Sequence, residues 1–322
     1  MTPPTSFAPK ATFSVVYFTF LIFSSDAASA PEPQYGDSFW KHWGDGQAEL
    51  AGYALTYNRY GEAREGVAVS VFVTETFSES ARVKADPGRH PKEDEYPVLK
   101  LNLMQDFPTG VYDYNMMTSA FVQLQPRLGR AGGAPTKISF SSQEWCGHVY
   151  QQLVFAKDAV QNTSHSYFDG EADQRESMKY PPGGMSADTL LVWARGLAGP
   201  VLRSGESVVV PLLTSLERSR LDHRPAMWTE ATLMRSNETT TLTVPAGTFD
   251  VSTLTARLKN GLEYTFFVES VFPHRVVRWT TSRGDDAKLL GDERMKYWQL
   301  NGRGGQEFLA KLGLSPRAVR SP

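Results

Sequence analysis

Hydrophobic and polar residues alternate with a period of two along much of the chain, which is the pattern of β-strands with one buried face. One face of the strand predicted over residues 66–76 carries four valines, Val67, Val69, Val71 and Val73. Similar runs predict strands over residues 96–103, 137–155, 163–168, 207–213, 231–234, 239–244, 251–258, 262–269 and 275–281. We therefore expect a mostly β protein.

Short turns connect several of these strands. Asn260-Gly261 separates two runs of β-branched and aromatic residues, and both residues tolerate the positive φ angles of a type I′ hairpin turn. Pro245, Ala246 and Gly247 form a second tight turn. Strands joined in this way pair antiparallel, so the fold class we predict is an antiparallel curled sheet or a partly closed barrel or sandwich with a few short helices.

The strongest helix signal lies in the middle of the chain, over residues 186–197. Ser186 is placed to cap its N-terminus, and Gly199-Pro200 ends it. A second short helix is predicted over residues 306–312, before Gly313. The central helix separates an N-terminal β-rich part, residues 31–200, from a C-terminal antiparallel part, residues 201–322; the two could also form one continuous domain.

The first thirty residues have the organisation of a signal peptide. An apolar run, Phe13–Phe23, follows Lys10 and precedes the small-residue sequence Ala28-Ser29-Ala30. This run is too short to cross about 30 Å of hydrocarbon as a helix. We expect cleavage after Ala30, export to the periplasm or the outside, and no transmembrane span in the mature chain.

Charge and cysteine content exclude several function classes. The chain of 322 residues has 33 basic and 35 acidic side chains, and this net charge of -2 offers no basic face for nucleic acid. Its one cysteine, Cys146, rules out an intramolecular disulfide or a zinc site of several thiolates. Asp169, Glu171 and Asp173 have the opening spacing of a calcium loop, but Gln174 stands where glycine is required. We expect neither a metal nor a cofactor.

The sequence QEWCGHVYQQ holds the most suggestive cluster of reactive side chains. If this run is one strand, Glu144, Cys146, His148 and Tyr150 point to one face and Trp145 to the other. A histidine beside a cysteine favours a thiolate nucleophile, and a carboxylate can orient the base. Residues two apart on a strand lie about 6 to 7 Å apart, so Cys146 and His148 need a bulge to meet. The alternative is a small buried cysteine, which an oxidising compartment favours.

A neighbouring strand could complete this catalytic arrangement. His165, Tyr167 and Asp169 share one strand face. If the two strands form a hairpin whose paired residue numbers have an odd sum, Cys146 and His148 lie opposite His165 and Asp169. An even sum places them opposite Ser164 and Phe168 instead.

Ligand-binding residues are expected among the aromatic and basic side chains. Arg59 and Tyr60 lie in a dense charged turn, where Arg59 either binds a substrate carboxylate or forms solvated ion pairs. Trp145, Tyr150 and Tyr167 could line a carbohydrate or lipid cavity, although such rings are more often part of a core.

Several segments resemble a family of exported bacterial proteins and lipoproteins. They are YNRYGEAREG (57–66), VFVTE (71–75), RVKAD (82–86), PVLKLN (97–102), QEWCG (143–147) and SHSYFDGEAD (164–173). Some members of the family carry the label septum formation inhibitor Maf. The Ser-x-Ser-Pro-Arg-Arg motif of the Maf nucleotide pyrophosphatases is missing here, so the resemblance implies export and not that activity. VPAGTF (244–249) is similar to a second group of exported, β-rich proteins.

Two functions follow as hypotheses. The first is a non-enzymatic cell-envelope protein that binds an apolar or amphipathic ligand within its curled sheet. The second is a hydrolase or transferase with Cys146 as nucleophile, His148 or His165 as base and Glu144 or Asp169 as the orienting carboxylate. The solvent exposure and reactivity of Cys146 distinguish them. The oligomeric state is left open.

Overall fold

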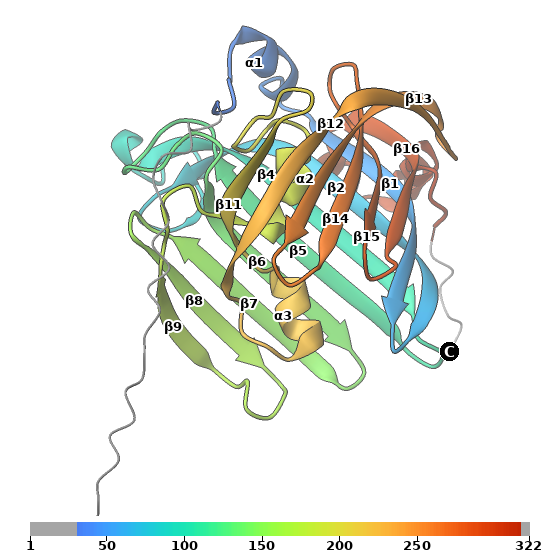
Figure 1. Cartoon of the computed structure of the whole chain (residues 1–322), viewed down its shortest axis with the longest axis horizontal. Helices are drawn as coiled ribbons and strands as arrows, with labels where there is room; N and C mark the ends of the chain where they lie inside the picture. Colours follow the sequence, from blue (N-terminus) through green and yellow to red (C-terminus); the bar gives the residue numbers. More distant parts are fainter. Residues whose placement is uncertain (1–30, 317–322) are drawn as a thin grey trace, which may run out of the picture.

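The structure is a computed structural model that describes residues 31–316. It contains one 16-stranded sheet (Figure 1). The strands are β1 (Ala48–Arg59), β2 (Glu62–Ser78), β3 (Val83–Lys84), β4 (Glu95–Pro108), β5 (Asp113–Gln123), β6 (Pro135–Glu144), β7 (Gly147–Phe155), β8 (Ala159–Ser166), β9 (Gln174–Lys179), β10 (Met185–Ser186), β11 (Ser207–Leu213), β12 (Trp228–Val244), β13 (Gly247–Leu258), β14 (Glu263–Glu269), β15 (Val276–Thr281) and β16 (Asp286–Met295). The helices are α1 (Asp37–Trp43), α2 (Leu190–Ala194) and α3 (Leu216–Asp222), with short 3₁₀ segments η1 (Lys92–Asp94), η2 (Ala187–Thr189), η3 (Tyr297–Gln299) and η4 (Arg303–Leu312).

The sheet is continuous from one edge to the other. Its strand order is β10-β11-β12-β13-β14-β15-β16-β1-β2-β4-β5-β6-β7-β8-β9, and β3 pairs with β2 at the side. The pairs are antiparallel except for β10 and β11. Because β16 pairs with β1, from Ala48 opposite Met295 onwards, the N-terminal and C-terminal parts of the chain share one sheet. The antiparallel curled sheet predicted from the sequence is therefore confirmed.

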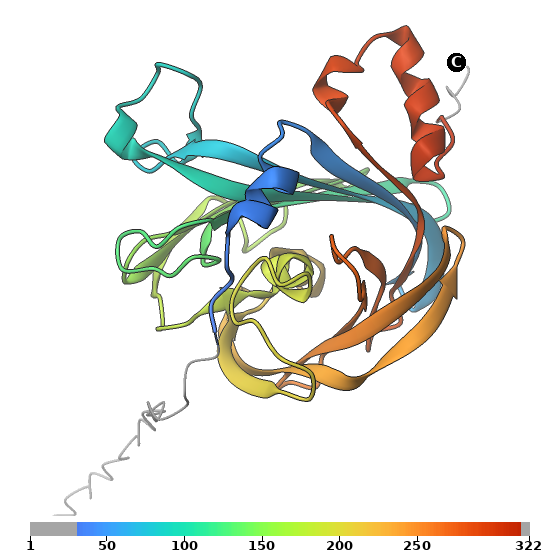
Figure 2. The ribbon, with the colours of Figure 1, turned by 90° about the horizontal axis from the view of Figure 1, so that it is seen from above.

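The sheet curls but does not close. Its two edges, β9 and β10, follow each other in the chain and are joined by residues 180–184, yet they do not pair. We call the gap between these edges the seam. Seen from above, the curl surrounds the segment that contains α2 (Figure 2). Every residue of α2 is buried, as expected for a helix enclosed on all sides.

The four valines of β2 lie on the outer face of the sheet and not in the interior of the curl. Val71 and Val73 belong to a separate apolar cluster with Leu312 of η4, whereas Phe72 faces the main core with Trp43. The C-terminal segment, red in Figure 2, thus covers the outer face of the sheet. The predicted valine face is real, and what buries it is the end of the chain.

The hairpin turn and the helix cap predicted from the sequence are found in part. The hairpin at Asn260-Gly261 forms, but only Gly261 has a positive φ, of 88°, so the connection is not the predicted type I′ turn. The Leu258 amide donates to the Leu262 carbonyl across a three-residue loop instead. Ser186 caps the central helix, as predicted, by accepting a hydrogen bond from the Asp188 amide. That helix is shorter than predicted because α2 ends at Ala194.

The signal peptide predicted over residues 1–30 lies outside the described residues. Within residues 31–316, no helix is long and apolar enough to cross a membrane.

Candidate functional site

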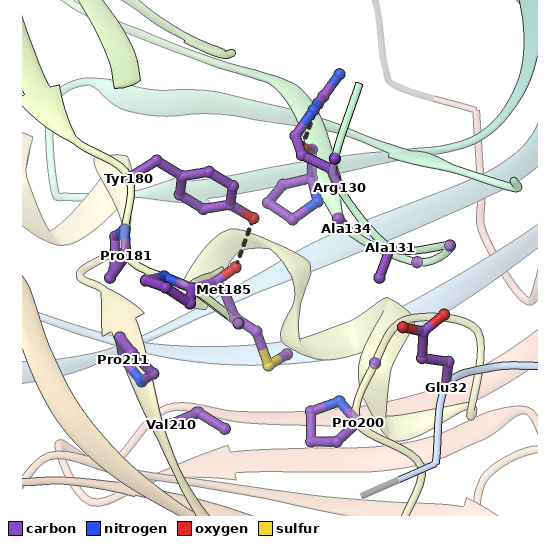
Figure 3. Close-up of a pocket in the computed structure, with 18 of the residues that line it drawn as sticks. Glu32, Arg130, Ala131, Ala134, Tyr180, Pro181, Met185, Pro200, Val210 and Pro211 are labelled. Carbon is purple, nitrogen blue, oxygen red and sulfur yellow. Dashed lines mark hydrogen bonds between the residues drawn. The ribbon is translucent and has the colours of Figure 1, made fainter. Parts of the chain in front are cut away.

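A pocket of about 520 Å³ opens at the seam, and we call it the seam pocket (Figure 3). Three segments form most of its wall: the loop 129–135 between β5 and β6, the loop 180–184 that joins the two sheet edges, and residues 208–211 of β11. Its apolar lining consists of Ala131, Ala134, Pro135, Pro181, Pro182, Met185, Pro200, Val208, Val209, Val210 and Pro211. The failure of β9 to pair with β10 therefore leaves an apolar hollow rather than a flat edge.

Glycine and a tyrosine hydrogen bond shape the loops around this pocket. Gly133 has a φ of 80°, and a Cβ there would lie 2.8 Å from the Gly199 nitrogen and 2.9 Å from the Pro33 ring. Only glycine allows the loop to pack so closely at this backbone angle. On the opposite wall, the Tyr180 hydroxyl donates to the Gly184 carbonyl over 2.8 Å and fixes the 180–184 loop.

Charged groups of the seam pocket lie at its margin. Glu32, Lys157 and Asp158 border it, and all three are exposed. The Arg130 guanidinium points away from the hollow and donates to the Pro135 carbonyl over 3.0 Å (Figure 3). Burial lowers the pKa of Arg130, against the attraction of Glu79. The pocket thus has an apolar interior and a polar rim.

The structure corrects the strand predicted over residues 137–155. Trp145 and Cys146 form a two-residue turn between β6 and β7, with Glu144 paired to Gly147. Glu144 therefore points into the curl, where its Oε1 accepts from Arg220 Nη2 over 2.6 Å. His148 is exposed on the outer face beside Gln143, so the four side chains expected on one face are separated.

Cys146 is exposed at the tip of this turn, and the expectation of a buried cysteine was wrong. The strand β8 does pair with β7 in the odd-sum register, but His165 lies opposite Tyr150 rather than His148. His165 Nδ1 contacts the Asp173 carboxylate over 2.8 Å at the surface. Asp169 lies in the exposed loop after β8. No hydrogen bond joins Cys146 to a histidine in the described part of the chain.

Three of the residues expected to bind a ligand come together at one end of the curl. The Arg59 guanidinium lies 4.2 Å from the centre of the Tyr60 ring. The Tyr60 and Tyr112 hydroxyls are 3.3 Å apart, and Tyr112 stacks against Trp145 with ring centres 6.3 Å apart. Tyr60 and Trp145 are 57% and 68% exposed, so this cluster is a surface feature and not a pocket.

The other two residues are apart from this cluster. Tyr150 lies on the outer face of β7, where its hydroxyl donates to Gln152 over 3.1 Å. Tyr167 is 70% exposed and packs over Gly147, where a Cβ would lie 2.5 Å from its ring. Neither residue lines the seam pocket.

Sequence reasoning missed the seam pocket. The segment 129–135 was recognisable only as a glycine-rich surface loop, and residues 180–184 (YPPGG) as another turn. Their density of glycine and proline is a signal for two loops, but not for their meeting in space. Among residues 31–316, no group of three or more His, Cys, Asp or Glu side chains is arranged to hold a metal.

The comparisons with known proteins identify no family for this chain. No family model and no curated protein matches the chain. A crystal structure of a β-barrel-like protein of the domain of unknown function DUF1849 from Brucella abortus is similar, with a TM-score of 0.44 and 11% identity. That match covers 78% of this chain and 98% of the other chain. A likeness at this level says nothing about what the chain binds or catalyses.

Proposed function

We propose that this protein is an exported, non-enzymatic binding protein that holds an apolar or amphipathic ligand in the seam pocket. The observation that carries the proposal is the volume of about 520 Å³ at the open seam. This volume lies within the range of about 300 to 1,000 Å³ that is usual for small-molecule sites. The export part of the proposal is supported by the sequence of residues 1–30 alone.

The chemistry of the lining supports an amphipathic ligand. Alanine, valine, methionine and proline side chains provide the wall, and burying apolar surface against them is worth about 25 cal/mol for each Å². Lys157 and Glu32 at the margin can contact a polar or charged end of the ligand. The ligand would thus place its apolar body between the loops and its polar end in water.

The interior of the curl is a poorer place for a large ligand. α2 occupies it, and Leu190, Val192 and Trp193 of this helix are at most 1% exposed. A bulky apolar molecule would have to displace the helix. The seam pocket needs no such rearrangement because it is already open.

Binding of the neutral fluorophore N-phenyl-1-naphthylamine tests the proposal, since its emission rises in apolar surroundings. Ala131→Trp would place an indole in the hollow, and we expect it to weaken binding by about tenfold or more, which is about 1.4 kcal/mol. Ala172→Trp is the matched control, because Ala172 is exposed in the loop after β8. Equal affinity of the two variants, or no saturable binding to the natural chain, would contradict the proposal.

A further inference from the structure

A second, smaller cavity of about 80 Å³ lies inside the curl, separate from the seam pocket, and we call it the inner cavity. It is bounded by strands from both halves of the sheet and by the starts of α2 and α3. Its lining consists of Tyr57, Leu101, Leu103, Gln105, Thr118, Ala187, Asp188, Leu190, Leu191, Ser215, Glu217, Arg218, Tyr264, Phe266, Trp279, Thr281 and Asp285. One water needs a cavity volume of about 10 to 15 Å³. The inner cavity therefore has room for about five waters or for a molecule of similar size.

Carboxyl groups outnumber basic groups around this cavity. Three carboxyl groups line it, those of Asp188, Glu217 and Asp285, against the single guanidinium of Arg218. Arg218 donates to Asp285 over 2.5 Å and lies 3.6 Å from Glu217. Asp285 is therefore the main ion-pair partner of Arg218. Arg283, which also attracts Glu217, is engaged by Asp222 at the surface. When these acids are ionised, their excess over basic groups favours a cation as the occupant.

Polar groups of this cavity also lack partners. Gln105 and Thr118 are each 5% exposed, and neither side chain makes a hydrogen bond within residues 31–316. Glu217 accepts from the Tyr57 hydroxyl through Oε1 over 2.5 Å, and no hydrogen bond reaches its Oε2 from the described chain. Buried polar groups are normally paired, so the amide, the hydroxyl and the carboxylate oxygen leave hydrogen-bonding capacity for a molecule in the cavity.

Aromatic rings complete the wall. Tyr57, Tyr264, Phe266 and Trp279 line the same cavity. The face of an aromatic ring attracts a cation within about 6 Å of its centre, and such rings beside a carboxylate form the usual pocket for organic ammonium ions. A simple metal ion could bind the carboxylates, but it has no apolar part to pack against the aromatic rings.

We propose that the inner cavity binds a small primary ammonium ion, whose N–H groups donate to Glu217, Gln105 and Thr118 and whose carbon chain lies against the aromatic rings. The excess of carboxyl groups balances its charge. The unpartnered amide and hydroxyl distinguish it from a quaternary ammonium, which has no N–H to donate. With room for about five non-hydrogen atoms, the ligand is a short alkyl- or hydroxyalkylammonium.

The raised pKa values of the cavity acids make the proposed binding depend on pH. Burial raises the pKa of Asp188 to about 7, although Ser186 and the Leu216 amide donate to it and partly oppose the change. Burial also raises the pKa of Glu217, against Arg218 and the Tyr57 hydroxyl, and raises that of Tyr264 to about 12. An ammonium ion favours the ionised carboxyl groups, so binding is expected to strengthen as pH rises through about 7.

Titration of the folded chain with n-propylammonium, followed by the backbone amide and indole NMR signals, tests the assignment. We expect saturable shifts around Trp279 and the start of α3, and binding at least about tenfold weaker for neutral n-propanol, the near-isosteric probe without charge. Tetramethylammonium, which lacks N–H donors, should also bind more weakly. Equal binding of n-propylammonium and n-propanol would overturn the assignment, and so would the absence of saturable shifts from n-propylammonium.

Two variants place the binding at the named residues. Gln105→Leu removes no hydrogen bond of the protein, so the chain should fold normally while its affinity for n-propylammonium falls. Gln143→Leu is the matched control, since Gln143 is an exposed strand glutamine on the outer face of β6. Glu217→Gln keeps an acceptor for Tyr57 but loses the charge, and it should weaken binding by about tenfold or more. Unchanged affinity in a folded Gln105→Leu or Glu217→Gln protein would overturn the proposal.

Discussion

Arg195 and Glu49 form a two-point ion pair between the end of α2 and strand β1. Arg195 Nη1 lies 2.6 Å from Glu49 Oε1, and Nη2 lies 3.1 Å from Oε2. Arg195 also donates to the Pro273 and His274 carbonyls of the turn between β14 and β15. One buried guanidinium thus joins the enclosed helix to strands from both halves of the sheet.

Loss of this guanidinium should destabilise the protein strongly. Arg195→Met leaves Glu49 buried without its main partner, and we expect the free energy of unfolding to fall by about 3 to 5 kcal/mol. Arg203→Met is the control, because the Arg203 side chain is 82% exposed and its pair with Glu206 should contribute little. Urea denaturation followed by tryptophan fluorescence measures both; a loss in Arg195→Met no larger than in Arg203→Met would contradict the role given to Arg195.

The same ion pair should make the protein sensitive to strong acid. Burial opposes ionisation of Glu49, but the charge of Arg195, its two hydrogen bonds and the nearby His42 ring lower the Glu49 pKa from 4.5 to about 2. A lowered carboxyl pKa stabilises the fold above the unfolded value and loses that stabilisation as pH falls towards 2. Glu49→Gln should therefore lower stability at neutral pH and flatten its decline below about pH 4 in denaturation curves. An equally steep decline in the variant would argue against this origin.

Asp188 should have the opposite pH dependence. Its pKa rises from 3.8 in the free side chain to about 7 in the fold, so the folded state binds the proton more tightly. The stabilisation from this group is complete below about pH 4 and is lost as pH rises through about 7, by at most about 4 kcal/mol. Asp188→Asn cannot ionise, so relative to it the natural chain should lose stability between about pH 4.5 and pH 8. A constant difference across this range would show that the Asp188 pKa is not raised.

Gly52 of β1 allows the C-terminal segment to pack closely on the outer face of the sheet. A Cβ on Gly52 would collide with the Leu312 carbonyl, and one on Gly291 of β16 would lie 2.6 Å from the Lys311 carbonyl. Gly52→Ala should detach η4, speed proteolysis of residues 303–316 and cost about 1 to 3 kcal/mol of stability. Gly302→Ala is the control, because nothing lies within 4 Å of a Cβ there. Equal proteolysis of the two variants would mean that the close approach at Gly52 is not required.

The reactivity of the Cys146 thiol distinguishes the binding protein from the cysteine-dependent enzyme, the two functions suggested by the sequence. The cysteine is exposed at a hairpin tip, and no hydrogen bond to its thiol occurs in residues 31–316. We expect iodoacetamide to alkylate the folded chain about as fast as the urea-unfolded chain, with no change in His148→Ala. A rate lowered about tenfold or more by His148→Ala would instead favour a cysteine-dependent enzyme.

The local sequence predicted strands and helix caps better than it predicted the sheet face on which a side chain lies. The valines of β2 and the Ser186 cap were predictable because alternation and capping depend on neighbours in the chain. The hairpin at Trp145-Cys146 was not, because residues 137–155 lack the Asn-Gly or Asp-Gly turn that marks a tight hairpin. That missed turn placed the side chains of β7 on the faces opposite to those expected, and it separated Glu144 from His148.

Both cavities depend on contacts that no local pattern records. The seam pocket joins residues 129–135 with residues 180–184 and 208–211, and the inner cavity brings Tyr57 to Glu217 from opposite halves of the chain. Arg59, Tyr60 and Trp145 were expected to bind a ligand, and they meet at the surface, outside either cavity.

The most direct test of the account is to locate bound N-phenyl-1-naphthylamine by amide NMR shifts in the natural chain. The account predicts saturable shifts in residues 129–135, 180–184 and 208–211, which line the seam pocket, and their loss in Ala131→Trp. Shifts confined to the outer face beneath η4 or to the Arg59–Trp145 surface, or an unchanged pattern in Ala131→Trp, would contradict it.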